Sequence, residues 1–109
     1  MIRRVIQLRQ RRACHIGVSH LSEAAWDILL DIYACELEGV AISVTAIGID
    51  AGIAPATAQR WITRLVAQGV LLRIVDPKDR RRAHISLAPG AASGMRNWHA
   101  EAHILLASN

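Results

Sequence analysis

The sequence predicts a mostly helical α+β fold in a single domain of 109 residues. Three observations predict it. Apolar residues recur at three- and four-residue intervals between Ser22 and Glu38, which is the spacing of one helix face. Apolar and polar residues alternate over residues 83–87, as in a half-buried strand. Glycines such as Gly39 and Gly69 stop the helical patterns.

The first third of the chain predicts two helices. A short helix is expected over residues 2–13, ended by Gly17, and a second from the N-cap Ser22 to about Glu38. The buried face of the second helix is expected to comprise Trp26, Leu29, Leu30, Tyr33 and Leu37. Three carboxylates are expected on its solvated side, with no base or nucleophile for acid–base catalysis: Glu23, Asp27 and Asp31.

A helix–turn–helix is predicted next, over roughly Ser43 to Gln68. A short edge strand, 40–42, precedes it. Ser43 then caps a short helix, 44–51, in which Gly48 is a weakening residue. The inward residues of that helix are expected to be Val44, Ile47 and Ala51. The second helix covers about 55–68, with a proline at the first helical position, where a missing N–H costs nothing.

The outer side of the helix at 55–68 carries residues suited to nucleic acid. Its inner face is expected to comprise Ala58, Trp61, Ile62 and Leu65. The outer residues are Thr57, Gln59, Arg60, Thr63 and Arg64. Arginine can form bidentate hydrogen bonds to guanine, glutamine can pair with adenine, and threonine can reach phosphates or a thymine methyl group.

A β-hairpin with a cationic tip is predicted to follow. Its strands cover 70–75 and 83–87, and the loop DPKDRRR at 76–82 is typical of a turn. The tip carries Arg80, Arg81 and Arg82. These arginines could form only a solubilising loop, but a hairpin directly after a basic helix places its tip beside the same duplex, where a narrow minor groove attracts arginine. The elements together predict a winged helix-turn-helix with a β-hairpin wing and short flanking N- and C-terminal helices.

A final helix is expected from about Ala91 to Leu106, and along one side it carries Met95, Trp98, Ala102 and Leu105. We expect this side to pack on a second copy of the chain; the alternative is docking on its own domain. The predicted divisions within the 1–109 domain are a basic arm or helix (1–20), a winged-helix core (21–88) and a dimerising helix (89–109).

Charge is segregated along the chain, although the net charge is only +4. Residues 1–20 carry five arginines and no acid, residues 21–50 carry six acids and no Lys or Arg, and residues 51–90 carry seven bases against two acids. This pattern favours a polyanionic partner, and an ordinary solvated surface is the alternative. No apolar run approaches the ~18 residues of a membrane span. Arginines interrupt the N-terminus, so a cytoplasmic protein is expected.

No catalytic, cofactor or metal site is predicted. His99 and His103 share a helix face around Glu101 but lack a third ligand. Cys14 and His15, with His20, have no second cysteine pair. A metal- or thiol-responsive sensor built on the two cysteines, Cys14 and Cys35, and the histidines is an open alternative. The thiols are expected to be reduced.

The order of these motifs resembles the winged-helix regulators of the MarR family over roughly residues 21–95. The matching stretches are SEAAWDILLDIY, PATAQRWITRLVAQGVLLR and DPKDRRRAHISL, followed by SLAPG at the start of the last helix. The most specific element is the D-x-R pattern of the wing, Asp79 and Arg81. The chain departs from the family in its short terminal helices and in Ala54 and Ala56, where serines are common.

The resemblance implies a homodimeric, sequence-specific regulator of transcription that binds double-stranded DNA. The helix at about 55–68 would enter the major groove and the wing at 76–82 would reach the minor groove. It implies base contacts from Thr57, Gln59 and Arg60, and phosphate contacts from Arg64 and Ser43. Asp79 would hold Arg81 in place. A small-molecule effector is possible in this family, but no residue here supports one. The alternative function is a winged-helix protein-interaction module without DNA binding, docking through its acidic helix.

Overall fold

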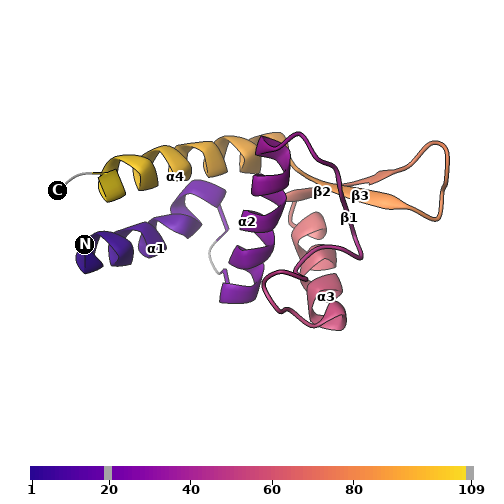
Figure 1. The fold of residues 1–109 in the computed structure, drawn as a ribbon, viewed down its shortest axis with the longest axis horizontal. Helices are drawn as coiled ribbons and strands as arrows, with labels where there is room; N and C mark the ends of the chain where they lie inside the picture. The colour runs from indigo at the N-terminus through magenta and orange to yellow at the C-terminus, as the bar shows by residue number, and fades with distance from the viewer. Residues whose placement is uncertain (19–20, 108–109) are drawn as a thin grey trace. The chain divides into compact units, whose positions relative to one another are not determined.

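The computed structural model describes residues 1–18 and 21–107, which form two compact units. The first unit comprises residues 1–21 and 89–109, and the second comprises residues 22–88. Among the described residues there are four α-helices and one three-stranded antiparallel sheet (Figure 1). The predicted mostly helical α+β class is therefore confirmed. None of the helices described is both long enough and apolar enough to cross a membrane.

The first unit is a pair of helices, α1 (Ile2–Ile16) and α4 (Pro89–Ala107), which pack along each other (Figure 1). Gly17 ends α1 as expected, with a left-handed φ of 78° and its N–H bonded to the carbonyl of Ala13. Both helices are longer than the sequence pattern predicted. The predicted ends were placed where apolar residues stop recurring at helical spacing, but the backbone hydrogen bonds of both helices extend beyond those points.

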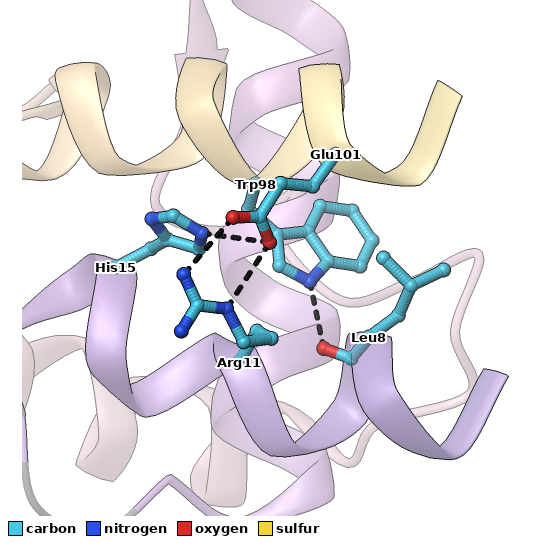
Figure 2. Close-up of polar contacts among 5 residues, drawn as sticks. All are labelled: Leu8, Arg11, His15, Trp98 and Glu101. Atoms are coloured by element: carbon cyan, nitrogen blue, oxygen red, sulfur yellow. Dashed lines mark hydrogen bonds and ion pairs between the residues drawn. The ribbon is translucent and has the colours of Figure 1, made fainter. Parts of the chain in front are cut away.

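Polar contacts join α1 and α4 at several levels, two of which are drawn in Figure 2. The indole N–H of Trp98 donates to the carbonyl of Leu8 at 2.9 Å. Nearer the end of α1, the Arg11 guanidinium donates to Glu101 Oε1 at 3.0 Å, and His15 Nε2 lies 3.0 Å from Glu101 Oε2. The hydrogen bonds of Arg11 and then the close approach of His15 lower the pKa of Glu101 to about 2.

The side of α4 expected to meet a second copy is already partly covered within one chain. Met95 and Ala102 are buried, while Trp98 and Leu105 are half-buried. The large apolar side chains of this unit that stay exposed lie elsewhere on the two helices: Met1, Ile2, Val5, Ile6, Ile104 and Leu106. The dimer contact of α4 therefore stays a prediction.

The second unit is built around α2 (Glu23–Leu37). Ser22 caps it as predicted, accepting the Ala25 N–H at 3.1 Å. The buried residues of α2 form a wider face than expected: Ala25, Trp26, Ile28, Leu29, Ile32 and Tyr33. Leu37 was expected to be buried but is 61% exposed, because the helix ends at this residue, and Leu30 is only half-buried.

The predicted helix at 44–51 is wrong. A two-residue strand, β1 (Ile42–Ser43), leads instead into successive turns over residues 44–52. Gly48 takes a left-handed φ of 84°, which ends any helix at this point, and its carbonyl accepts the Ile53 N–H. Ile47 is buried and Val44 half-buried, whereas Ala51 is exposed, so only part of the expected inner face forms. Ser43 caps no helix.

The remaining elements of this unit follow the prediction closely. They are α3 (Pro55–Ala67) and the wing strands β2 (Leu71–Val75) and β3 (Ala83–Leu87). The strand order is β1-β3-β2, with Leu71 opposite Leu87 and Val75 opposite Ala83. α2 and α3 pack together, and each also contacts a strand of the sheet.

Candidate nucleic-acid interface

α3 divides cleanly into a buried and an exposed side. Ala58, Ile62 and Leu65 are 0–2% exposed and anchor the helix in the core of its unit. The outer residues include four that are exposed, Gln59, Arg60, Thr63 and Arg64, and the half-buried Thr57. The hydrophobic anchoring on one side leaves the other side free to enter a groove, since a duplex major groove admits an α-helix.

Trp61 is a residue whose importance the sequence pattern did not indicate. It was expected on the inner face but is only half-buried, and the Arg64 guanidinium lies 4.8 Å from its ring centroid. A cation over an indole face is held electrostatically. Arg60, Trp61 and Arg64 line one shallow hollow of about 230 Å³. A Trp three residues before an Arg on a helix is the signal that could have identified this pair.

The wing tip is shaped by its two aspartates. Asp76 Oδ1 accepts the Lys78 N–H at 2.8 Å, and Asp79 Oδ1 accepts the Arg81 N–H at 3.1 Å. Asp79 also lies 3.4 Å from Arg81 Nε. The Arg81 side chain is nevertheless 93% exposed. Ion pairs this exposed are weak, so Asp79 leaves the Arg81 guanidinium accessible to a larger anion.

A hollow of about 490 Å³ brings three distant segments together. β1 and the turn after it contribute Ser43 and Thr45, α3 contributes Gln59, and the wing contributes arginines. The full lining is Ser43, Val44, Thr45, Gln59, Arg73, Arg81, Arg82, Ala83 and His84. No carboxylate is among these described lining residues, so the hollow suits an anion.

The hollow separates the predicted site residues into groups. Ser43, Gln59, Arg81 and Arg82 share it, whereas Arg60 and Arg64 border the second hollow on α3. Thr57, Thr63 and Arg80 line neither of the two. Arg73 belongs to the cationic lining and was not among the predicted contacts. Its signal was its position: an arginine at the centre of a strand of apolar residues.

This anion-suited surface does not come from net charge. Residues 22–88 contain seven Lys and Arg and eight Asp and Glu, so the unit carries 7 − 8 = −1. The cationic lining of this unit is therefore a local gathering of arginines on α3 and the wing, not a result of the net charge of the unit.

The histidines and cysteines form no comparable site. Among residues 1–18 and 21–107, no three His, Cys, Asp or Glu side chains are placed to hold one metal ion, and His20 lies outside the described residues. Cys14 and Cys35 are free thiols. Burial, and then the nearby Asp31, raises the pKa of Cys35, which lowers its reactive thiolate fraction.

A helical core, an exposed helix after a turn segment, and a β-hairpin wing carrying arginines define a winged-helix DNA-binding protein. The family model of the MarR family matches residues 21–83, more than half of the chain. The chain belongs to the MarR family, whose regulators are transcription factors rather than enzymes. It is accordingly a DNA-binding transcriptional regulator. No curated protein matches the sequence.

Solved structures share the fold at low identity. The S. aureus MepR–DNA complex is 14% identical with a TM-score of 0.74, covering 94% of this chain and 79% of that chain. The transcriptional regulator Tm0710 from Thermotoga maritima is 22% identical with a TM-score of 0.69, covering 94% and 69%. A mutant form of MarR from E. coli is 18% identical with a TM-score of 0.65, covering 97% and 79%.

Proposed function

We propose that this chain acts in the cytoplasm as a homodimer that binds a pseudo-palindromic DNA site, with α3 in the major groove and the wing toward the adjacent minor groove. The observation that carries the proposal is the hollow shared by Gln59 of α3 and by Arg81 and Arg82 of the wing. A single duplex lying across this hollow would meet both elements at once. The structure of MepR from S. aureus, which has the same fold, is a DNA complex.

Base recognition falls to the outer side of α3. Arg60 is exposed beside Trp61 and can present its guanidinium to the O6 and N7 atoms of guanine. Gln59 can form the corresponding pair with adenine, and Thr57 lies two residues before it on the same helix. These three side chains would carry the sequence preference.

Phosphate contacts would position the helix. Arg64 is held over Trp61, while Ser43 lines the larger hollow; Thr63 is exposed on the same helix. Arg73 joins this set because it lines the hollow between α3 and the wing. Arg80, Arg81 and Arg82 would lie along or within the minor groove, whose negative potential favours arginine. Such contacts fix the register of the protein without reading bases.

Dimerisation would use the helical unit. On α4, Trp98 and Leu105 are half-buried, and the neighbouring Ile104 is 64% exposed. On α1, Ile2 is 72% exposed. A second copy covering these apolar side chains would remove them from water and set the distance between two half-sites. Sedimentation at several protein concentrations tests this, and a monomer throughout would contradict it.

The test of DNA recognition begins with selection of bound sequences from a random duplex pool, which also reveals half-site spacing. On the selected site, we expect Arg60→Ala to cost about 1–3 kcal/mol and to relax the preference at one position. Arg96→Ala is the matched control: it removes the same charge from α4, where Arg96 bonds to Ser93.

Equal binding of Arg60→Ala and the parent to selected and random DNA would show that Arg60 does not read bases. Failure of the parent to bind any duplex at low salt would refute the proposed function itself. It would favour the protein-interaction alternative.

A further inference from the structure

Glu36, on the last turn of α2, is bonded to the base of the wing. Its Oε1 atom accepts the backbone N–H of Leu87 at 2.9 Å and the hydroxyl of Ser86 at 3.0 Å. Both residues lie at the end of β3. Glu36 is exposed and contributes nothing to the apolar core, so its position is defined by these two bonds.

The Leu87 N–H needs this acceptor because the sheet does not supply one. The next residue, Ala88, donates to Val70 on the β2 side, and alternate residues of a strand point their N–H groups in opposite directions. Leu87 therefore points toward the β1 side. β1 begins at Ile42, which is opposite Ile85, and so it has no residue level with Leu87. The Glu36 carboxylate occupies the position of the missing strand.

The direction of the wing depends on how its base is held. From Leu87 to Arg81 there are six residues, or roughly 20 Å at ~3.3 Å per residue. A tilt of about 10° at the base would move the tip by roughly 3–4 Å, more than the length of a hydrogen bond. A two-stranded hairpin has little stability of its own, and β1 adds only two residues to it. Any change in how the base is held is therefore magnified at the tip, and the Glu36 bonds act at this base beside the buried side chains of Leu71 and Leu87.

We propose that Glu36 is a positioning residue for DNA binding: by bonding to Leu87 and Ser86 it fixes the direction of the wing, so that Arg81 and Arg82 reach the same duplex as α3. The proposal rests on the proposed function, because it assumes that the wing contacts DNA. This role requires no contact between Glu36 and nucleic acid, and as a carboxylate Glu36 would be repelled by phosphate.

The test is a double-mutant cycle on a duplex that the parent binds. The four proteins are the parent, Glu36→Ala, the wing variant Arg81→Ala/Arg82→Ala, and the combination. We expect Glu36→Ala to weaken binding, and to have at least about threefold less effect when the wing arginines are already absent. Glu36→Gln keeps an acceptor oxygen and should bind within about twofold of the parent.

Glu38→Ala is the matched control. It removes the same charge two residues away, and the Glu36 carboxylate still holds Ser86 and Leu87, so this change should not couple to the wing arginines. Circular dichroism melting checks that each variant is folded. If Glu36→Ala does not fold, Ser86→Ala, which removes one of the two donors, takes its place in the cycle.

Two kinds of failure are distinguishable. If the wing variant alone binds as tightly as the parent, the proposed contact between wing and DNA is wrong. If the wing variant weakens binding but the Glu36 change is silent or strictly additive with it, the wing contact stands and the positioning role of Glu36 is wrong. A loss with Glu36→Gln equal to that with Glu36→Ala would also overturn the role.

Discussion

The crossing of α1 and α4 depends on the absence of a side chain at position 94, and Gly94→Ala tests this directly. A Cβ built on Gly94 would lie 2.1 Å from the carbonyl oxygen of His15 and 2.9 Å from its carbonyl carbon. These are backbone atoms of α1 and cannot rotate away as a side chain could. Ordinary contact begins near 3.4 Å, so the helices would have to separate by about 3.4 − 2.1 = 1.3 Å.

The expected cost follows from two opposing effects. Overpacking of a well-packed interface costs about 1–3 kcal/mol, and a clash with backbone belongs at the upper end. The exchange of Gly for Ala inside a helix returns about 1 kcal/mol. We therefore expect Gly94→Ala to lower the free energy of unfolding by about 2 kcal/mol, largely because the packing between α1 and α4 loosens.

Urea unfolding at a fixed protomer concentration measures this difference, since a dimer would make the midpoint depend on concentration. Gly90→Ala is the matched control: it lies on the same helix, and a Cβ there meets nothing within 4 Å. It should leave stability unchanged or raise it slightly. A Gly94→Ala protein as stable as the Gly90→Ala protein would refute the close crossing of the two helices.

Two further predictions concern charge. Replacing Arg80, Arg81 and Arg82 with alanine should lower DNA affinity. The slope of log K against log salt concentration should become shallower by about 1 for each phosphate that is no longer neutralised. An unchanged slope would show that the wing does not touch DNA. In the folded protein the pKa of Glu101 is about 2, below its ordinary value of 4.5. The ionised carboxylate therefore stabilises the fold fully at a pH above 4.5, and this stabilisation is lost as the pH falls toward 2. Glu101→Gln should therefore be less stable than the parent at pH 7, by urea midpoint, with the gap closing between about pH 5 and pH 2; a gap that stays constant with pH would contradict the pairing with Arg11 and His15.

Local signals predicted the elements whose ends are determined by single residues. Ser22 accepts an N–H at the start of α2, Pro55 opens α3, and Gly69 follows its end with a φ of 75°. The second wing strand, β3, was predicted by alternation, which the sheet enforces because one face of β3 is buried at Ile85 and Leu87. The first, β2, was predicted by its β-branched and aliphatic residues.

The segment at 44–52 could not be predicted in this way. Its pattern of Val44, Ile47 and Ala51 satisfies helical spacing, yet the structure uses Gly48 in a conformation that no helix contains. Two contacts favour this conformation. One is local, since a Cβ on Gly48 would come within 3.2 Å of the Ile53 side chain, and the other is tertiary, since Asp31 of α2 accepts the Gly48 N–H at 3.1 Å. Neither contact is visible in local periodicity.

The residues of the candidate interface likewise divide into those that local sequence identifies and those that depend on tertiary contacts. The residue types on α3 were identified from one helix face, because burial of Ala58, Ile62 and Leu65 determines which residues are left outside. Arg73 and Trp61 were missed as contacts because their roles depend on neighbours distant in space or on partial exposure. The hollow lined by Ser43, Gln59, Arg73 and Arg81 exists only once three segments have folded together.

Two acidic residues of α2 form hydrogen bonds that the sequence pattern did not predict. Asp31 was expected on a solvated stripe, but it is half-buried and bonds to the turn that precedes α3, while Glu36 bonds to the base of the wing. Asp31 accepts the Gly48 N–H in the left-handed turn, and Glu36 accepts the Leu87 N–H that the short β1 does not reach. The acidic helix thus bonds to the turn before α3 and to the base of the wing, while the arginines of the wing line a hollow that contains no carboxylate among the lining residues described.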